Sequence, residues 1–368
     1  MAQAAGGSAP LIVLAAGGTG GHLFPAEAAS HALHARGFRV ALITDTRAAE
    51  YAGSFPAESI HAVPAATPSG KSPLKMAKAA FVLLRGALAA RAAIRALKPA
   101  MVVGFGGYPT VPPVFAAALM GVPTMVHEQN AVAGRANRFL AGRVKLIATG
   151  FAEVGGLAPE QAAKCRQVGN PVRPAVIAAA SPYPALDGRL ELLVFGGSQG
   201  ARVMADIVPP ALQLLPPEER ARISVVQQAR VEDDERVRRV YADLGIRFEL
   251  APFFKDLPAR MAASHLVIGR AGASTVAELT VIGRPAILVP LPGSLDQDQA
   301  ANAAVLERAG GALRILQPDF TPARLAAELS ALLAEPSRLT AMAASAKSAG
   351  IPDAADRLAR LIAETAQI

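Results

Sequence analysis

Cysteine and charge are both scarce in this chain of 368 residues. It has a single cysteine, Cys165, and 18% charged residues. One cysteine cannot form an intramolecular disulfide and leaves no cysteine cluster for a metal, which fits a reducing compartment. The six histidines show no paired spacing with carboxylates of the kind found at zinc sites. We therefore expect a cytoplasmic protein that holds no metal ion and no cofactor.

The sequence also lacks an uninterrupted hydrophobic segment. The apolar run that starts at Leu11 follows no basic segment and breaks at Gly17 and Gly18, unlike a signal peptide or an anchor. The uncharged span 99–126 is long enough to cross a bilayer, but prolines and glycines interrupt it repeatedly. We expect this span to form two short strands and a short helix.

Apolar residues are abundant and make up 52% of the chain. This content and length suffice for two domains with their own cores, and they exclude a disordered or fibrous protein. The net charge of +8 lies in residues 1–165, which have 15 Lys and Arg against 7 Asp and Glu, whereas the remaining residues have 22 of each. A basic half predicts a polyanion or an anionic membrane surface as its partner.

Four apolar runs each end in a glycine-rich turn followed by helix-favouring sequence. They read LIVLAAGGTGG from Leu11, AMVVGFGGYP from Ala100, ELLVFGGSQGA from Glu191 and HLVIGRAGAST from His265. This alternation indicates βαβ units and a parallel sheet, and its two similar series predict an α/β protein of two tandem Rossmann-like domains. Ligands bind outside the carboxyl ends of such strands, so we expect all four turns to face one interdomain cleft.

Prolines between residues 169 and 188 interrupt the helix and strand patterns, and the domain boundary is expected there. We assign residues 1–170 to the first domain and 171–350 to the second. Residues 351–368 form a C-terminal helix that starts at Pro352 and Asp353.

The first turn, GGTGGHLFPA at residues 17–26, is open to three interpretations. It fits the dinucleotide fingerprint only in part, because Leu23 stands where the third glycine belongs, although Asp45 ends the next strand as a ribose-binding carboxylate would. His22 at the start of a helix suits proton transfer. The third possibility is a tight turn with a solvated histidine.

The stretch GRAGASTVAEL at residues 269–279 predicts either a diphosphate site or a helix cap. Ser274 or Thr275 can cap the following helix, and free backbone N–H groups there would hold a diphosphate. Glu278, one turn on, could accept hydrogen bonds from both hydroxyls of a ribose. The alternative is a capping box, in which Ser or Thr pairs with the glutamate.

Two further polar segments follow apolar strands. PLPGSLDQDQAANA at residues 290–303 has side chains suited to sugar hydroxyls, or it is a plain polar loop. Its candidates are Asp298, Gln299 and Asn302. HEQNAVAG at residues 127–134 puts four polar side chains at a strand end, which is unusual for packing alone. They are His127, Glu128, Gln129 and Asn130.

Seven motifs together resemble, in order and spacing, the bacterial MurG family. They are GGTGGHLFPA, GFGGYPT, HEQNAVAG, VGNPVRP, GGSQGA, GRAGASTVAEL and DQDQAANA. Members of that family are N-acetylglucosaminyltransferases that complete lipid II on the inner face of the cytoplasmic membrane. The resemblance runs from about residue 11 to residue 360, and it implies the GT-B fold, two Rossmann-like domains facing a cleft.

The resemblance implies that the C-terminal domain binds UDP-N-acetylglucosamine and that the N-terminal domain receives the lipid-linked acceptor, lipid I. The donor residues would be Ser198 and Gln199 at the diphosphate, which the helix opening near Ala273 would face, with Glu278 on the ribose and the backbone of Phe254 at the uracil. Arg173 lies in a motif that contacts the donor in the family, and Asn130 and Gln299 would fix the sugar. The residues themselves add Ser274, Thr275 and Asn302 to the expected donor site. On the other wall, Thr19, Gly20 and Gly21 would approach the phosphates, with His22, Tyr108 and Glu128 placed for the acceptor. The sequence departs from the family at VVQQARVED, where His-Gln and a Gly-Lys turn are common.

The expected reaction is an inverting transfer to the 4-hydroxyl of the muramyl sugar, with His22 as general base and Glu128 in reserve. Helix-terminal N–H groups would stabilise the departing diphosphate without a metal. Two alternatives stay open: another UDP-sugar transferase or epimerase of the same fold, and a nicotinamide-dependent oxidoreductase. We expect no nucleic-acid partner.

Residues 72–98 predict a long helix with Pro73 at its first position. One side, assigned to the core, carries Met76, Leu83, Ile94 and Leu97. The other side carries Leu74, Lys78, Phe81, Arg85, Leu88 and Arg95. This mixed face suits the headgroup boundary of the anionic inner membrane, to whose cytoplasmic side the protein would bind peripherally. The alternative is a solvated face whose basic stems cover a few leucines.

Overall fold

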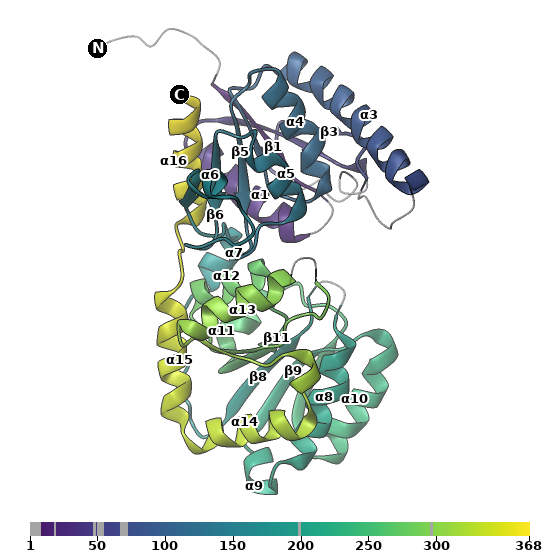
Figure 1. Ribbon diagram of the computed structural model, residues 1–368. Coiled ribbons are helices and arrows are strands. Elements are labelled where there is room, and N and C mark those ends of the chain that lie inside the picture. The colour runs from purple at the N-terminus through teal and green to yellow at the C-terminus, as the bar shows by residue number, and fades with distance from the viewer. Residues whose placement is uncertain are drawn as a thin grey trace, which may run out of the picture. The chain divides into compact units, whose positions relative to one another are not determined.

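The computed structural model describes residues 9–17, 20–46, 49, 55–66, 73–197, 200–294 and 297–368. The chain divides into two compact units, Met1–Arg173 with Asp353–Ile368, and Pro174–Pro352 (Figure 1). Each unit is an α/β domain with its own parallel sheet and its own hydrophobic core. The predicted fold class of two Rossmann-like domains is confirmed.

Strands and helices alternate along the first unit, as βαβ units require. Its described elements are β1 (Leu11–Ala15), α1 (Gly20–Ala35), β2 (Arg39–Thr44), β3 (Ser59–Ala62), α3 (Pro73–Leu97), β4 (Met101–Gly104), the 3-10 helix η2 (Tyr108–Thr110), α4 (Val111–Leu119), β5 (Thr124–Glu128), α5 (Arg135–Ala141), β6 (Leu146–Thr149), α6 (Pro159–Ala162), β7 (Cys165–Gln167) and α16 (Ala354–Ala366). The uncharged span 99–126 thus forms two strands and a short helix, as predicted. Among the described residues, no helix has both the length and the apolar character needed to cross a bilayer.

The described strands of the first unit form one parallel sheet in the order β3-β2-β1-β4-β5-β6-β7. Side chains of β1 alternate between its two faces, so that Ile12 and Leu14 join a core with α1 and α16, whereas Leu11 and Val13 join a core with α3, α4 and α5. The chain moves outward from β1 to β3 and then returns to β4 on the other side of β1. The order therefore reverses between β1 and β4, which is where ligands of such sheets bind.

The helix at the end of the chain, α16, belongs to the first unit. It packs on α1 through Leu358 and Ile362, which are fully buried. Nζ of Lys145 donates a hydrogen bond of 2.8 Å to the carbonyl oxygen of Thr365. The chain thus returns to complete the helix layer beside β1.

The helix predicted at residues 72–98 is observed as α3, but the predicted core side was partly wrong. Ile94 is buried, whereas Met76 is 54% exposed. The helix contacts α4 through a stripe of small buried residues that includes Ala79, Gly86 and Ala90. At 1.5 Å per residue, α3 is about 37 Å long and α4 only about 13 Å. The shorter partner cannot cover the whole of α3, so Met76 stays exposed.

The second unit repeats the pattern with a different set of helices. Its described elements are α7 (Pro174–Ala179), β8 (Leu190–Phe195), α8 (Arg202–Leu214), α9 (Pro217–Arg220), β9 (Ile223–Gln228), α10 (Val231–Asp243), β10 (Arg247–Ala251), α11 (Leu257–Ala263), β11 (Leu266–Gly269), α12 (Ala273–Ile282), β12 (Ala286–Leu288), α13 (Asp298–Arg308), β13 (Ala312–Arg314), η4 (Gln317–Asp319), α14 (Pro322–Ala334) and α15 (Pro336–Ser348). The strands form a parallel sheet in the order β10-β9-β8-β11-β12-β13, so the order reverses between β8 and β11. In both units the reversal lies between two of the strands that end in glycine turns.

Candidate active site

The first unit brings three of the predicted motifs, GGTGGHLFPA, GFGGYPT and HEQNAVAG, to one edge of its sheet. Ala15 of β1 pairs with Gly104 of β4, and β4 pairs with β5. Because these strands are parallel, their carboxyl ends lie side by side. The turn before α1, the turn after β4 and the segment after β5 therefore meet at the point where the strand order reverses.

His22 lies in the first turn of α1, and its ring lies against the turn after β4. A Cβ atom on Gly106 would lie 3.2 Å from Cδ2 of His22, and one on Gly107 would lie 3.3 Å from Nδ1. The imidazole is half-buried, and Tyr108 continues the same turn. Gly20 and Gly21 begin α1 directly before it. The structure thus brings His22, Tyr108 and the two glycines into one small region.

The Glu128 carboxylate holds the loop that follows β5. Oε1 accepts hydrogen bonds from N of Asn130, at 2.9 Å, and from its Nδ2, at 3.3 Å. Oε2 accepts from N of Gly134, at 2.9 Å, and from Nδ2 of Asn137, at 2.8 Å. The side chain is 1% exposed, and this burial raises the pKa of its carboxyl, although all four hydrogen bonds favour the ionised form. These contacts are those of a loop-holding residue, and they weigh against Glu128 as a base.

His127, directly before it, is fully buried in the same strand. Its Nε2 lies 3.0 Å from the carbonyl oxygen of Gly169, and its ring stacks on Phe105. Burial lowers the pKa of His127 to about 4. The imidazole is therefore neutral at physiological pH and donates its Nε2 proton to Gly169.

Arg173, at the end of the first unit, packs against α1. Its guanidinium carbon is 4.1 Å from the centroid of the Phe24 ring, a cation–π contact. Phe24 is two residues beyond His22 on the same helix. Arg173 is thus placed near the start of α1 by the fold, although it is far from it in sequence.

In the second unit, α12 starts at Ala273, and the predicted side-chain cap is wrong. The N-cap is Gly272, with no side-chain hydrogen bond to the first turn, and N of Val276 donates to the carbonyl oxygen of Gly272 at 3.0 Å. Ser274 and Thr275 lie inside the first turn, so neither can act as the N-cap of a capping box with Glu278. The N–H groups of residues 273–275 consequently have no acceptor within the helix. Glu278 is buried in the next turn.

Two amides of α13 support the turn before α12. Oε1 of Gln299 accepts hydrogen bonds from N of Ala271, at 3.3 Å, and from N of Leu291, at 3.0 Å. Both donors are backbone N–H groups, so the oxygen must face them and Nε2 is the end left for a sugar. Nδ2 of Asn302 donates to the carbonyl oxygen of Ala271 at 3.1 Å. Asn302 is fully buried, which weighs against its direct contact with a sugar.

Sequence reasoning missed Arg270, which ties three segments together. Nη1 donates to the carbonyl oxygens of Val289 and Pro290, both at 3.1 Å, and Nη2 donates to Oε1 of Gln317 at 2.7 Å. Burial lowers the pKa of Arg270. A charged residue directly after a buried strand was the signal available in the sequence.

Four predicted site residues remain, of which the structure describes only Phe254. Phe254 is buried and packs under the guanidinium of Arg260, 4.4 Å from the ring centroid. Three predicted residues, Thr19, Ser198 and Gln199, lie outside the described residues. In the described part of the chain, no three His, Cys, Asp or Glu side chains gather as metal ligands would.

Comparison with known proteins finds the same two-part organisation. The glycosyltransferase family 28 N-terminal domain matches residues 12–149, and the family 28 C-terminal domain matches residues 191–358. The chain is 62% identical over 361 residues to the UDP-N-acetylglucosamine--N-acetylmuramyl-(pentapeptide) pyrophosphoryl-undecaprenol N-acetylglucosamine transferase of Methylobacterium sp. (strain 4-46), covering 97% of each.

Two solved structures extend the comparison. MurG of Acinetobacter baumannii is 29% identical, with a TM-score of 0.78 over 96% of this chain and 99% of that one. A putative UDP-N-acetylglucosamine 2-epimerase of Listeria monocytogenes is 15% identical, with a TM-score of 0.67 over 96% of this chain and 95% of that one. The second likeness is one of fold alone.

Proposed function

The chain belongs to glycosyltransferase family 28, within which it is a member of the MurG family, and on that premise we propose that it transfers N-acetylglucosamine from UDP-N-acetylglucosamine to lipid I, giving lipid II. The observation that carries this proposal is the 62% identity to an enzyme of that name over nearly the whole chain. The matched length covers 97% of this chain and 97% of that enzyme.

The second unit binds the donor in this proposal. The N–H groups at the start of α12 have no acceptor within the helix, and they supply the positive end of a helix dipole to the diphosphate. Glu278 accepts from the ribose hydroxyls, and the backbone at Phe254 receives the uracil. Nε2 of Gln299 donates to the sugar, and Asn302 supports Gln299 by holding the turn at Ala271.

The first unit binds the acceptor and supplies the base. His22 takes the proton of the 4-hydroxyl of the muramyl sugar as its oxygen attacks the anomeric carbon of the donor. The bond from that carbon to the diphosphate breaks, and UDP leaves from the opposite side with inversion. His22 is favoured over Glu128 because the four hydrogen bonds of Glu128 are taken up by its own loop. Tyr108, Gly20 and Gly21 lie beside the base, and Asn130 and Arg173 contact the donor from this unit.

The two alternatives have less support. An epimerase shares the fold at 15% identity, whereas the transferase is 62% identical. A nicotinamide enzyme would use Asp45 for a ribose, and it would need the third glycine of the dinucleotide fingerprint, where this chain has Leu23. The carboxylate of Asp45 packs against Gly17, where an added Cβ would lie 2.7 Å from Oδ2.

The proposal is tested by measuring enzymatic turnover. Purified protein, UDP-N-acetylglucosamine and a short-chain lipid I analogue should give a disaccharide product and UDP in equal amounts. Incubation of the donor alone should give no epimer, and NAD should not shift the melting temperature, whereas UDP should raise it. Epimer formation without acceptor, or stabilisation by NAD alone, would refute the proposal.

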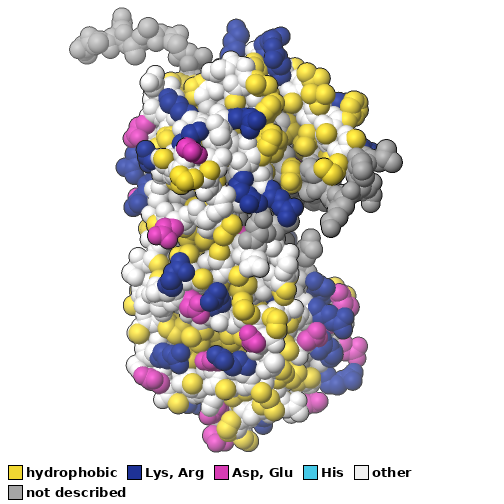
Figure 2. Space-filling view, in the orientation of Figure 1, with side chains coloured by type: hydrophobic (Ala, Val, Ile, Leu, Met, Phe, Trp, Pro, Cys, Tyr) yellow, Lys and Arg dark blue, Asp and Glu magenta, His cyan; other side chains and the backbone are white. Residues whose placement is uncertain are grey.

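We also propose that α3 binds the cytoplasmic face of the inner membrane peripherally. Phe81 and Leu88, which are 60% and 61% exposed, lie on the same helix as the exposed basic residues Lys78, Arg85 and Arg95. Figure 2 shows hydrophobic side chains gathered over the part of the first unit that holds α3 and α4, with Lys and Arg around them. Such a face suits the headgroup boundary of an anionic membrane, where a lipid-linked acceptor resides.

The membrane proposal predicts weaker liposome binding when charge is reversed. Each basic residue near an anionic surface contributes about 1 kcal/mol, so Lys78→Glu, Arg85→Glu and Arg95→Glu together should reduce binding at least about a hundredfold at low salt. UDP binding in solution should stay unchanged. The matched control reverses three exposed cations of the second unit, Arg189, Arg239 and Arg308. Equal loss in both triple variants would mean that α3 is not the contact.

A further inference from the structure

Gln228, the last residue of β9, bonds to two separate segments of the second unit through one side chain. Oε1 accepts a hydrogen bond from N of Gly196 at 3.0 Å. Nε2 donates to the carbonyl oxygen of Gly197 and to that of Pro252, both at 3.0 Å. The partners are all backbone groups of fixed character, so the orientation of the amide is determined. The side chain is 6% exposed, and no ligand or solvent is needed to explain its contacts.

The first of these segments is the glycine turn between β8 and α8. A Cβ on Gly196 would lie 2.2 Å from N of Ala201, so only glycine allows the turn to close on itself. Gly197 and Gly200 have φ of +92° and +68°, conformations that side chains disfavour. Steric limits thus define the backbone conformation of Gly196, Gly197 and Gly200. Gln228 bonds to N of Gly196 and to the carbonyl oxygen of Gly197 at the beginning of the turn.

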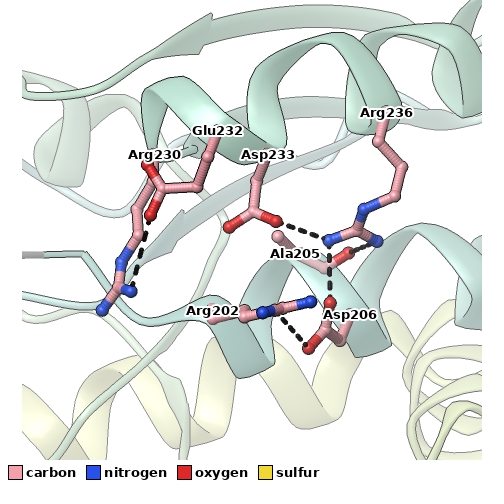
Figure 3. A network of polar contacts seen from close by, with 7 residues as sticks. All are labelled: Arg202, Ala205, Asp206, Arg230, Glu232, Asp233 and Arg236. Atoms are coloured by element: carbon pink, nitrogen blue, oxygen red, sulfur yellow. Dashed lines mark hydrogen bonds and ion pairs between the residues drawn. The ribbon is translucent and has the colours of Figure 1, made fainter.

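The connection that follows Gln228 holds the other end of the turn. Nη2 of Arg230 donates to the carbonyl oxygen of Gly200 at 3.1 Å, and Arg230 is the N-cap residue of α10. Figure 3 shows how α10 is fixed to α8: Arg236 donates to the carbonyl oxygen of Ala205 at 3.1 Å and to Oδ1 of Asp206 at 2.7 Å. It also bonds to Asp233 in the first turn of α10, at 2.8 Å. These contacts therefore join the first turns of the two helices.

The second segment, at Pro252, leads into the residue expected at the uracil. Phe254 is two residues beyond Pro252, and Arg260 lies over its ring. Arg260 is itself bonded to Asp256, at 2.8 Å, and to Glu249, at 2.7 Å. Directly before Pro252, the carbonyl oxygen of Ala251 accepts a hydrogen bond of 3.0 Å from N of Ala229, the residue after Gln228.

We propose that Gln228 is a positioning residue for the donor, which holds the diphosphate turn after β8 and the uracil segment at Pro252 in one register. This inference rests on the proposed donor site in the second unit. A UDP molecule that binds both segments gains most when they are already held at the right separation, because no ordering is then needed on binding. Without Gln228 the two segments stay attached to β8 and β10, which both pair with β9, but the side-chain hydrogen bonds that join their ends beyond the sheet are lost.

The test compares ligands that reach one segment or both. Gln228→Met keeps the length of the side chain and removes all three hydrogen bonds, and calorimetry would give its affinity for uridine and for UDP. We expect the preference for UDP over uridine to fall at least about tenfold, whereas the affinity for uridine changes little. The KM for UDP-N-acetylglucosamine should rise without a matching change in the KM for the acceptor. Gln213→Met, at an exposed position on α8, is the matched control and should leave the preference unchanged.

A second variant separates positioning from loss of stability. In Gln228→Glu the ionised carboxylate still accepts from N of Gly196, but its other oxygen faces two carbonyl oxygens. Protonation restores one donor, so the UDP affinity of this variant, relative to wild type, should rise as pH falls from about 8 to 5.5. The affinity is measured well below the Tm of the variant at each pH, so that a loss of stability alone leaves the folded fraction, and hence the UDP affinity, unchanged.

The outcomes distinguish the inference from the function on which it rests. Failure of the wild-type protein to bind UDP would overturn the donor site itself. Wild-type binding with an unchanged UDP preference in Gln228→Met, or a pH-independent Gln228→Glu ratio, would overturn the positioning role alone. A reduced preference together with pH rescue would establish it.

Discussion

Replacing Glu128 by glutamine separates a loop-holding carboxylate from a catalytic base. Glutamine has the same size, but one of its two terminal atoms is an NH2 group that cannot accept hydrogen bonds. If that group takes the place of Oε1, the two donors of Asn130 lose their acceptor; if it takes the place of Oε2, Gly134 and Asn137 lose theirs. In either orientation two of the four hydrogen bonds to the carboxylate are lost.

The magnitude follows from these contacts. Removing one partner of such a hydrogen bond costs about 1–3 kcal/mol, so the loss of two bonds costs about 2–6 kcal/mol. For a unit of this size 1 kcal/mol lowers Tm by roughly 2–4 °C, and Glu128→Gln should therefore lower Tm by at least about 4 °C. A base, in contrast, contributes about a hundredfold to ten-thousandfold in rate with little effect on stability.

Differential scanning calorimetry and initial rates with the lipid I analogue would measure both quantities on the same protein samples. Glu153→Gln, an exposed glutamate of the first unit, makes the same chemical change without loss of these bonds and should leave Tm unchanged. An unchanged Tm with a rate loss of a hundredfold or more in Glu128→Gln would refute the loop-holding role and restore Glu128 as the base.

Three other predictions concern single side chains. His22→Ala should lower turnover by roughly a hundredfold to ten-thousandfold while UDP affinity stays nearly constant, with His31→Ala on the same helix as control; near-normal turnover at saturating acceptor would remove His22 from the base role. Glu278→Ala should weaken UDP binding by about 10- to 150-fold in calorimetry, and Glu218→Ala should not; equal affinities would leave Glu278 a packing role only. The depressed pKa of His127 means that the unfolded chain binds a proton near pH 6.5 and the folded chain only near pH 4, so stability should be lost as pH falls through this window. The loss amounts to roughly 3 kcal/mol. In denaturant titrations His127→Gln should have a shallower decline between these pH values, and a parallel decline would contradict the assignment.

Much of the fold could be read from the sequence because it depends on local pattern. The apolar runs that end in glycines became β1, β4, β8 and β11, and prolines in the span 99–126 ended its elements where expected. The long helix α3 was likewise predicted from its periodicity. Its core side was not, because the coverage of Met76 depends on the length of α4, a separate element.

The segments that form the site could be predicted from the sequence, but the role of each side chain could be predicted less well. The motif order identified the family, and with it the segments that gather at the carboxyl ends of the strands. Whether a given polar side chain reaches a ligand or another loop was not encoded in its motif. Glu128 and Asn302 looked like ligand-binding groups, yet each is bonded to its surroundings inside the protein.

The sequence by itself determined the strands, the glycine turns, the two-domain series and the family of this protein, because hydrophobic periodicity and turn chemistry act between near neighbours. Only the tertiary structure decided that α12 starts at Ala273 without a side-chain cap, that Arg173 stacks on Phe24, and that Gln228 bonds both to Gly197 and to Pro252. The partners in the last two cases are separated by tens of residues along the chain, and a hydrogen bond or a ring contact needs atoms within a few ångström. Such proximity depends on how the strands assemble into sheets, and no single motif in the sequence contains that information.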